Sequence, residues 1–134
     1  MSDDRKLFEG VCDCIRQTLQ KDLPDMSESD RLVADLEADS LDFLDLIFRL
    51  EKAFDVRVNP RDLERRTRET LGDCPMIVDE RYTARAVEEF IKAMPEAPEG
   101  ELYPDMPVNK LAESFRVKTF MNLVAYARAN GGSA

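Results

Sequence analysis

The sequence predicts an all-α fold, on three observations. Apolar residues recur at helical spacing in successive segments, and prolines and glycines separate these segments. The short strand-like alternation of Val56 and Val58 ends at once at Asn59-Pro60. With 134 residues, the chain is long enough for one domain with a single modest core.

The first helix is predicted from about Asp3 to Gln20. Its helically spaced apolar residues are Leu7, Phe8, Val11, Ile15 and Leu19. A loop is expected from about Lys21 to Asp39, because Pro24 and a cluster of serines and aspartates interrupt the pattern there. The loop residues expected to enter the core are Leu32, Val33 and Leu36.

The three cysteines predict neither a metal site nor a redox site. Cys12 and Cys14 are two residues apart on the first helix and therefore point to nearly opposite sides of it. Their spacing matches no zinc or redox motif. We expect these thiols to behave as small hydrophobic side chains.

A second helix is predicted to begin at Ser40, and it is apolar on two faces. The stripe expected to face the core consists of Phe43, Leu46, Ile47, Leu50 and Phe54. The opposite half-turn, on the side of Ser40, mixes Leu41, Leu44 and Phe48 with Asp45 and Glu51. A merely solvated face does not need three large apolar residues, so either this face contacts a partner or it packs inward under a neighbouring loop.

A third helix is predicted from about Pro60 to Leu71, with Pro60 at its first position. Its arginines are Arg61, Arg65, Arg66 and Arg68. They would suit contact with an acidic partner or a phosphate, or they would form a solvated face with local Glu and Asp partners. We favour the solvated face.

Two later segments compete for the place of the last helix of the bundle. Thr83 is predicted to cap a helix that carries Val87, Phe90, Ile91 and Met94 and stops at Pro95. Residues 95–107 hold four of the seven prolines and form either a linker or an ordered crossing. One or two amphipathic segments then follow Val108. Either Tyr82 to Met94 or Val117 to Ala129 closes the bundle. We favour the second, because Phe115, Phe120 and Val124 are too apolar for an accessory segment outside the core.

The charge is strongly negative and concentrated. The formal net charge is −9, and ten acidic against three basic residues give −7 between Asp25 and Asp55. This excludes nucleic acid as the expected partner and favours docking onto basic patches of other proteins. The sequence has no apolar run long enough to span a membrane, and its N-terminus lacks the basic and apolar regions of a signal peptide, so we expect a cytoplasmic protein.

The residues around Ser40 resemble a known family. The segment from Asp35 to Asp42, DLEADSLD, begins a run similar to the acyl carrier proteins, which are small acidic helical bundles. The run continues with Leu44, Asp45, Leu46, Ile47, Leu50, Glu51, Phe54, Asp55 and Val56. It departs from the usual pattern at Glu37, where glycine is common, and at Phe43 and Phe48, which are bulkier than usual.

The resemblance implies an acyl-carrier-protein-like four-helix bundle with extra helical segments in the C-terminal half. We expect a single carrier domain over residues 1–134, with the first two helices and the Ser40 motif in 1–60, enlarged third and closing helices in 61–134, and the Pro-rich crossing at 95–107. In this family the serine of the Asp-Ser-Leu motif carries a covalent 4′-phosphopantetheine arm, taken from coenzyme A, whose thiol holds acyl groups as thioesters. Carried over, the arm attaches to Ser40. The extra length resembles atypical long carriers associated with specialised lipids such as lipid A.

The chemistry of Ser40 agrees with modification by another enzyme. A serine hydroxyl is a weak nucleophile without a nearby base, and the chain contains no histidine, so a self-contained serine hydrolase is not expected. A phosphodiester on Ser40 would lie near the positive end of the helix dipole. The alternative is that Asp39 or Ser40 is simply an N-cap, the commonest reason for these residues at a helix start.

The resemblance also predicts the partners. A phosphopantetheinyl transferase, acyl-loading or condensing enzymes and acyltransferases would dock in turn on one face, while the chain stays a monomeric non-enzyme without metal or membrane insertion. The expected docking residues are Asp39, Leu41, Asp42, Asp45, Phe48 and Glu51. Two alternatives remain: a peptidyl, aminoacyl or polyketide carrier, or a non-carrier adaptor with the same bundle.

Overall fold

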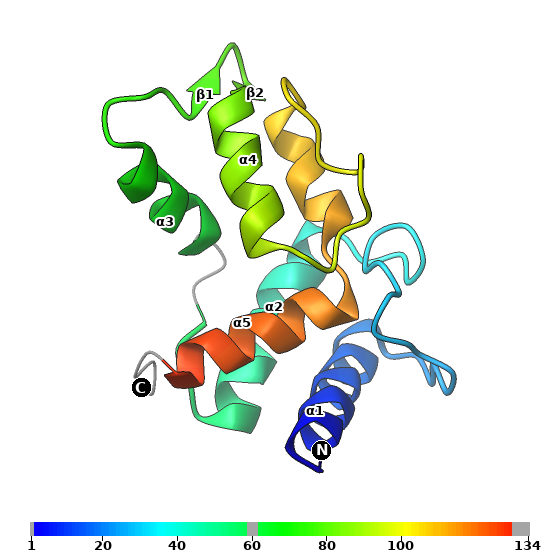
Figure 1. Cartoon of the computed structure of the whole chain (residues 1–134). Coiled ribbons are helices and arrows are strands. Elements are labelled where there is room, and N and C mark those ends of the chain that lie inside the picture. The colour runs from blue at the N-terminus through cyan, green and yellow to red at the C-terminus, as the bar shows by residue number, and fades with distance from the viewer. Residues whose placement is uncertain (1, 59–61, 130–134) are drawn as a thin grey trace. The chain divides into compact units, whose positions relative to one another are not determined.

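The computed structural model describes residues 2–58 and 62–129 and is mostly helical (Figure 1). The elements are α1 (Ser2–Leu19), α2 (Ser40–Phe54), α3 (Asp62–Leu71), β1 (Ile77–Val78), β2 (Arg81–Tyr82), α4 (Ala84–Ala93), the 3₁₀ helix η1 (Val108–Ser114) and α5 (Val117–Ala129). The all-α prediction is confirmed, apart from one two-stranded hairpin. The start of the third helix at Pro60 lies outside the described residues.

The chain divides into two compact units. Unit one contains Met1–Asn59 and Phe115–Ala134, and unit two contains Pro60–Ser114. Unit one therefore comprises α1, α2 and α5, whereas unit two comprises α3, the hairpin, α4 and η1. That the whole chain acts as a single carrier domain stays a prediction.

Helix α5 closes unit one, as we favoured for the Val117 to Ala129 segment. Its inward side chains are buried in the same core as those of α1 and α2: Val117, Phe120, Met121, Val124 and Ala127. The core also contains Leu32 and Leu36 from the loop before α2, as predicted, while Val33 is half-buried. Burial of this much apolar surface is the main favourable term in the stability of the unit.

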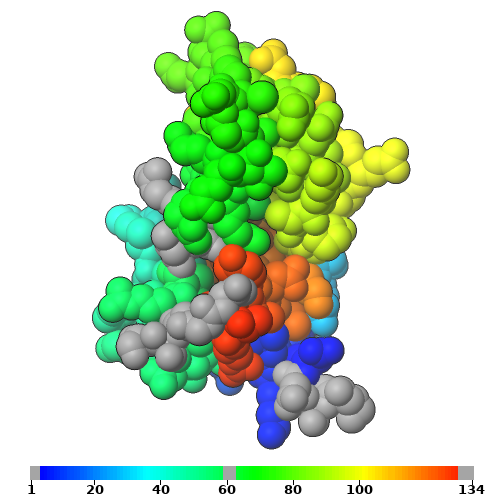
Figure 2. Space-filling view, turned by 60° about the vertical axis from the view of Figure 1, so that its left-hand side comes forward, coloured from blue at the N-terminus to red at the C-terminus, as the bar shows by residue number. Residues whose placement is uncertain are grey.

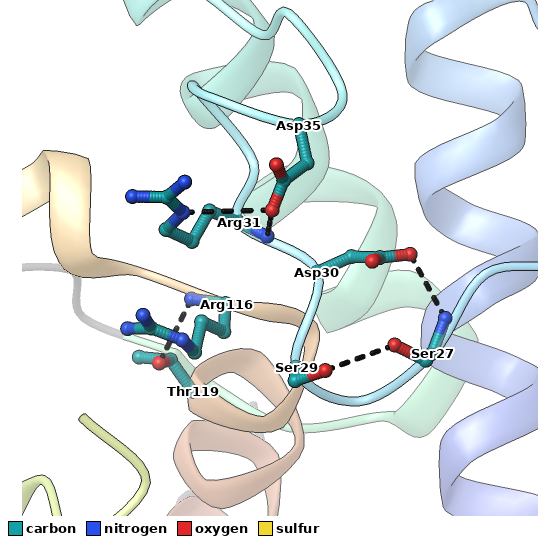
Figure 3. Close-up of polar contacts among 7 residues, drawn as sticks. All are labelled: Ser27, Ser29, Asp30, Arg31, Asp35, Arg116 and Thr119. Carbon is teal, nitrogen blue, oxygen red and sulfur yellow. Dashed lines mark hydrogen bonds and ion pairs between the residues drawn. The ribbon is translucent and has the colours of Figure 1, made fainter. Parts of the chain in front are cut away.

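The loop between α1 and α2 is tied to the start of α5 by backbone hydrogen bonds. The N–H groups of Val117 and Lys118 donate to the carbonyls of Asp30 (3.0 Å) and Glu28 (2.9 Å). Because the first N–H groups of a helix have no partner within it, the loop satisfies donors that α5 would otherwise leave open. Figure 3 shows the same junction, where the Arg116 N–H donates to the Thr119 hydroxyl (3.0 Å). The loop is thus part of the folded unit.

Helices α1 and α2 approach each other closely at Gly10. A Cβ atom added there would lie 2.6 Å from Cζ of Phe54, so a larger residue would force the ring to move. The Arg128 guanidinium of α5 lies 4.9 Å from the centre of the same ring. Phe54 therefore connects all three helices of unit one.

The cysteines of α1 behave as expected. Cys12 and Cys14 are buried in the core of unit one. Burial raises the pKa of the Cys12 thiol to about 11 and also raises the pKa of Cys14. Both thiols are therefore neutral at physiological pH, as hydrophobic side chains should be.

Unit two is built on the packing of α3 against α4 (Figure 2). The ring of Tyr82 meets the ring of Phe90 edge-on at 4.7 Å, and its hydroxyl donates to Glu64 of α3 (2.9 Å). Thr83 caps α4, as predicted, by accepting the Ala86 N–H at 3.3 Å. On α3, Arg65 pairs with Glu69 at 3.3 Å, the local partnering that we favoured for the arginines.

The hairpin before α4 was not predicted. Ile77 pairs with Tyr82 and Val78 with Arg81, and the turn residues Asp79 and Glu80 have φ of 53° and 63°. Such a turn usually contains asparagine or glycine, which this segment lacks, so its sequence gives no hairpin signal. The Pro-rich segment is an ordered crossing beside the hairpin. The backbone N–H of Tyr82 donates to the carbonyl of Met106 (2.9 Å), and the carbonyl of Tyr82 accepts the backbone N–H of Asp105 (3.0 Å).

Candidate attachment site

Helix α2 begins with a complete capping box. Asp39 is the N-cap, and its Oδ1 accepts the backbone N–H of Asp42 at 2.9 Å. In return, Oδ2 of Asp42 accepts the backbone N–H of Asp39 at 2.9 Å. These reciprocal bonds fix where the helix starts. Of the two candidate caps, Asp39 therefore caps the helix, and Ser40 is its first residue.

The hydroxyl of Ser40 is left available by this arrangement. Its side chain is exposed, and within the part of the chain that the structure describes no group forms a hydrogen bond with it. The first N–H groups of α2 point towards the same end, where the helix dipole is positive. A negatively charged phosphodiester on this oxygen would be stabilised there, so the residues present fit such a group.

The turn before Ser40 contains a strained residue. Glu37 has φ of 63°, a left-handed conformation that glycine adopts more readily than glutamate. The turn is closed by the N–H of Ala38, which donates to the carbonyl of Leu32 at 2.8 Å. With Leu36 and Ala38 buried on either side, the backbone at Glu37 has little freedom to relax. This geometry gives a physical reason why glycine suits the position.

The second apolar face of α2 is exposed. The exposed fractions of Leu41, Leu44 and Phe48 are 75%, 64% and 56%. The alternative that these residues pack inward under a loop is therefore wrong. Leu44 was missing from the expected docking residues, although its spacing of three from Leu41 and four from Phe48 places it on the same stripe.

The acidic residues of the expected docking face also have local partners. Oδ2 of Asp45 accepts the Nε–H of Arg49 at 2.7 Å, and this hydrogen bond lowers the pKa of Asp45. Oε2 of Glu51 accepts the backbone N–H of Val58 at 3.0 Å. Asp39 and Asp42 form the capping box. The structure thus gives these four residues roles in the fold, and their role in docking stays a prediction.

Comparison with known proteins decides the family. The family model described as "Phosphopantetheine attachment site" matches residues 9–74. The chain is 33% identical to the acyl carrier protein of Thermotoga maritima over 81 residues, which are 60% of this chain and 98% of the relative. It is 35% identical to the acyl carrier protein of Borreliella burgdorferi strain ZS7 over 79 residues, 59% of this chain and 96% of that protein.

The chain belongs to the acyl carrier protein family. It is also similar to the acyl carrier protein AcpXL of Brucella melitensis, with 37% identity over 51 residues, 38% of this chain and 55% of that protein. No solved structure matches. The prosthetic group of the family is a covalent 4′-phosphopantetheine, and the matched range includes α2 with Ser40.

The described residues offer neither a metal cluster nor a membrane-spanning helix. Within residues 2–58 and 62–129, no cluster of three or more potential ligand side chains is placed to hold a metal ion. No helix in the same residues combines the length and the apolar character needed to cross a membrane.

Proposed function

We propose that this protein carries acyl groups as thioesters on a 4′-phosphopantetheine arm attached to Ser40 and presents them to enzymes of fatty acid or specialised lipid biosynthesis. The observation that carries the proposal is the free, exposed hydroxyl of Ser40. Because Asp39 caps the helix, Ser40 has no capping role to lose when it is modified. The family match supplies the chemistry of the group.

Attachment would be carried out by a phosphopantetheinyl transferase. The Ser40 oxygen attacks the phosphorus atom that bears the pantetheine of coenzyme A, a new phosphorus–oxygen bond forms, and adenosine 3′,5′-bisphosphate leaves. The hydroxyl proton passes to a base of the transferase, since no histidine is present in this chain. The bound arm supplies a thiol that forms thioesters. The chain itself contributes an accessible oxygen at the positive end of a helix, and it acts as a carrier, not as a catalyst.

The docking surface would be the exposed stripe Leu41, Leu44 and Phe48 together with the acidic side chains near it. Acyl-loading or condensing enzymes, acyltransferases and the transferase would use it in turn. An apolar centre with charged neighbours suits contacts that form quickly and release readily. We keep a monomer and a cytoplasmic location as predictions.

A specialised lipid pathway, such as that of lipid A, is proposed on the length of the chain. The Thermotoga acyl carrier protein is almost wholly spanned by 60% of this chain, so the remainder of the chain is additional to it. A peptidyl, aminoacyl or polyketide carrier would share the arm and differ in its cargo. A non-carrier adaptor would lack the arm.

Intact mass spectrometry tests the proposal. The purified protein is incubated with coenzyme A and a phosphopantetheinyl transferase, and wild type is expected to gain one phosphopantetheinyl group. Ser40→Ala should gain none while keeping its helical circular dichroism spectrum. Ser29→Ala is the matched control, because Ser29 is also exposed and lies in the same unit.

Modification of Ser40→Ala would reject the attachment site, and an unmodified wild type would favour the adaptor. Fragmentation of the group on the thiol, in protein purified from its own organism, then separates acyl from aminoacyl or polyketide cargo.

A further inference from the structure

Three phenylalanine rings are in mutual contact at the end of α2 that carries Ser40. The ring of Phe43 stacks on that of Phe115, with 6.1 Å between the ring centres and 13° between the ring planes. The ring of Phe120 meets both edge-on, with its centre 5.9 Å from that of Phe43 and 6.0 Å from that of Phe115. Ring centres at these separations belong to favourable aromatic pairs. We call these three residues the aromatic cluster.

The aromatic cluster runs from the surface into the core of unit one. Phe43 and Phe115 are half-buried and pack against that core, whereas Phe120 is only 1% exposed. Phe43 is three residues after Ser40 in the same helix, and residues three apart are neighbours on a helix surface. The cluster therefore occupies the core beside the proposed attachment site.

The backbone around Phe115 holds its ring in place. The carbonyl of Phe115 accepts the N–H of the buried Leu32 at 3.0 Å, and two residues further on the N–H of Val117 donates to Asp30 at 3.0 Å. Phe115 thus stands on a segment that is bonded to the α1–α2 loop. Moving its ring away would cost aromatic contacts and strain these hydrogen bonds.

An acyl chain on the Ser40 arm would have a physical reason to enter this core. Transfer of each methylene group from water into an apolar interior is favourable, and a tether at Ser40 keeps the chain at a high local concentration. Beside Ser40, however, the aromatic cluster already fills the interior. A chain would have to displace a ring to enter there, and inserting groups into a packed core is destabilising.

We propose that the aromatic cluster closes the core of unit one beside Ser40, so that an acyl chain on the arm stays outside this core whatever its length. Phe43 is one of the positions at which this sequence departs from the usual carrier pattern. In this arrangement the carrier does not select acyl chains by length, because no core cavity of fixed depth measures them. The proposal rests on the proposed function, since the chain must be attached at Ser40.

The test is the melting temperature of the protein with acyl chains of different lengths. Wild type, Phe43→Ala and Phe43→Leu are loaded by a phosphopantetheinyl transferase from acetyl-, octanoyl- or dodecanoyl-coenzyme A, and intact mass spectrometry verifies one acyl arm per chain. An acyl chain that enters the core binds only the folded protein and therefore raises its melting temperature. The three forms of wild type should melt at the same temperature.

Phe43→Ala should behave differently, because loss of the ring leaves a cavity that a long chain can fill. Its dodecanoyl form is expected to melt at least about 4 °C above its acetyl form, the shift that burial of one or two methylene groups gives in a small domain. Phe43→Leu removes less volume and should show a smaller shift in the same direction. The leucine variant keeps the test decisive if the alanine variant does not fold.

The matched control is Phe54→Ala. Phe54 is also a half-buried phenylalanine of α2 that packs against the same core, but it lies fourteen residues from Ser40, about 21 Å along the helix. The control should melt below wild type, as expected for loss of a ring from the core. Its melting temperature should not depend on the length of the acyl chain.

Three results would overturn the proposal. A melting temperature that rises with chain length in wild type would mean that the chain is sheltered with all three rings present. Phe43 variants whose melting temperatures do not change with chain length would mean that this ring is not what closes the core. In both cases the arm is attached, so the carrier function stands. If wild type takes up no arm, the proposed function fails, and the proposal for its acyl chain fails with it.

Discussion

Helix α2 carries large apolar side chains on two faces, and the two faces differ in what they contact. Leu46, Ile47 and Leu50 are buried in the core of unit one. Leu41, Leu44 and Phe48, which have similar spacing and similar side chains, are exposed. Burial explains the first group, because each buried side chain contributes to folding. The exposed side chains of the second group give no such benefit, so we expect them to contact partner proteins.

Removing the C-terminal segment should have the largest effect on stability, because the buried face of α2 packs in the same core as α5. Truncation after Pro107 removes Val117, Phe120 and Val124, each of which is worth roughly 1.5 to 3 kcal/mol when buried. Their sum rivals the whole net stability of a small domain. We expect the truncated chain to unfold or aggregate, as measured by thermal melting and size-exclusion chromatography. A monomer that melts at the wild-type temperature would contradict the role of α5.

A pair of leucine variants compares the two faces directly. Leu50→Ala, on the buried face, should lower the free energy of unfolding by about 2 to 5 kcal/mol, because it leaves a cavity. Leu44→Ala, on the exposed face, should change it by less than about 0.5 kcal/mol. Urea denaturation measures both.

The functional effects should run the other way. In assays below the melting temperature, the phosphopantetheinyl transferase should modify Ser40 more slowly in Leu44→Ala than in Leu50→Ala. Equal stabilities for the two variants, or a Leu44→Ala variant with wild-type kinetics, would remove the distinction between the faces.

The start of α2 allows a finer comparison between two adjacent residues. Asp39→Ala should cost about 0.5 to 2 kcal/mol of stability, because it removes the cap. Ser40→Ala should cost less, since its hydroxyl holds no hydrogen bond in the described part of the chain. Chemical denaturation of the two variants without the arm tests this division between a structural residue and a modified one. A greater loss from Ser40→Ala would show that its hydroxyl supports the fold.

A small gain in stability is expected from a substitution at Glu37. Glu37→Gly should stabilise the protein by about 0.4 to 1 kcal/mol, because glycine adopts the left-handed φ without steric cost. The melting temperature should rise slightly while the attachment rate at Ser40 stays the same. A lower melting temperature would mean that the Glu37 side chain contributes more than its backbone costs.

The structure places most predicted helices where the sequence suggested them. Helix α2, the cap at Thr83 and the loop residues Leu32 and Leu36 were all visible as local patterns. Each of these signals depends on neighbours within a few residues, such as a capping side chain or a repeat every three to four positions. The hairpin at 77–82 was not predicted, because its turn lacks the asparagine or glycine that usually marks such a turn.

By itself, then, the sequence determined the helices, the position of Ser40 at the start of α2 and the resemblance to the family. Only the tertiary structure decided between the two candidates for the closing helix, through the bonds that join Val117 and Lys118 to the α1–α2 loop. It also decided that Leu41, Leu44 and Phe48 are exposed and that Asp45 and Glu51 have local partners. The physical reason is that periodicity fixes which side chains share a face, whereas burial depends on contacts between residues far apart in the chain.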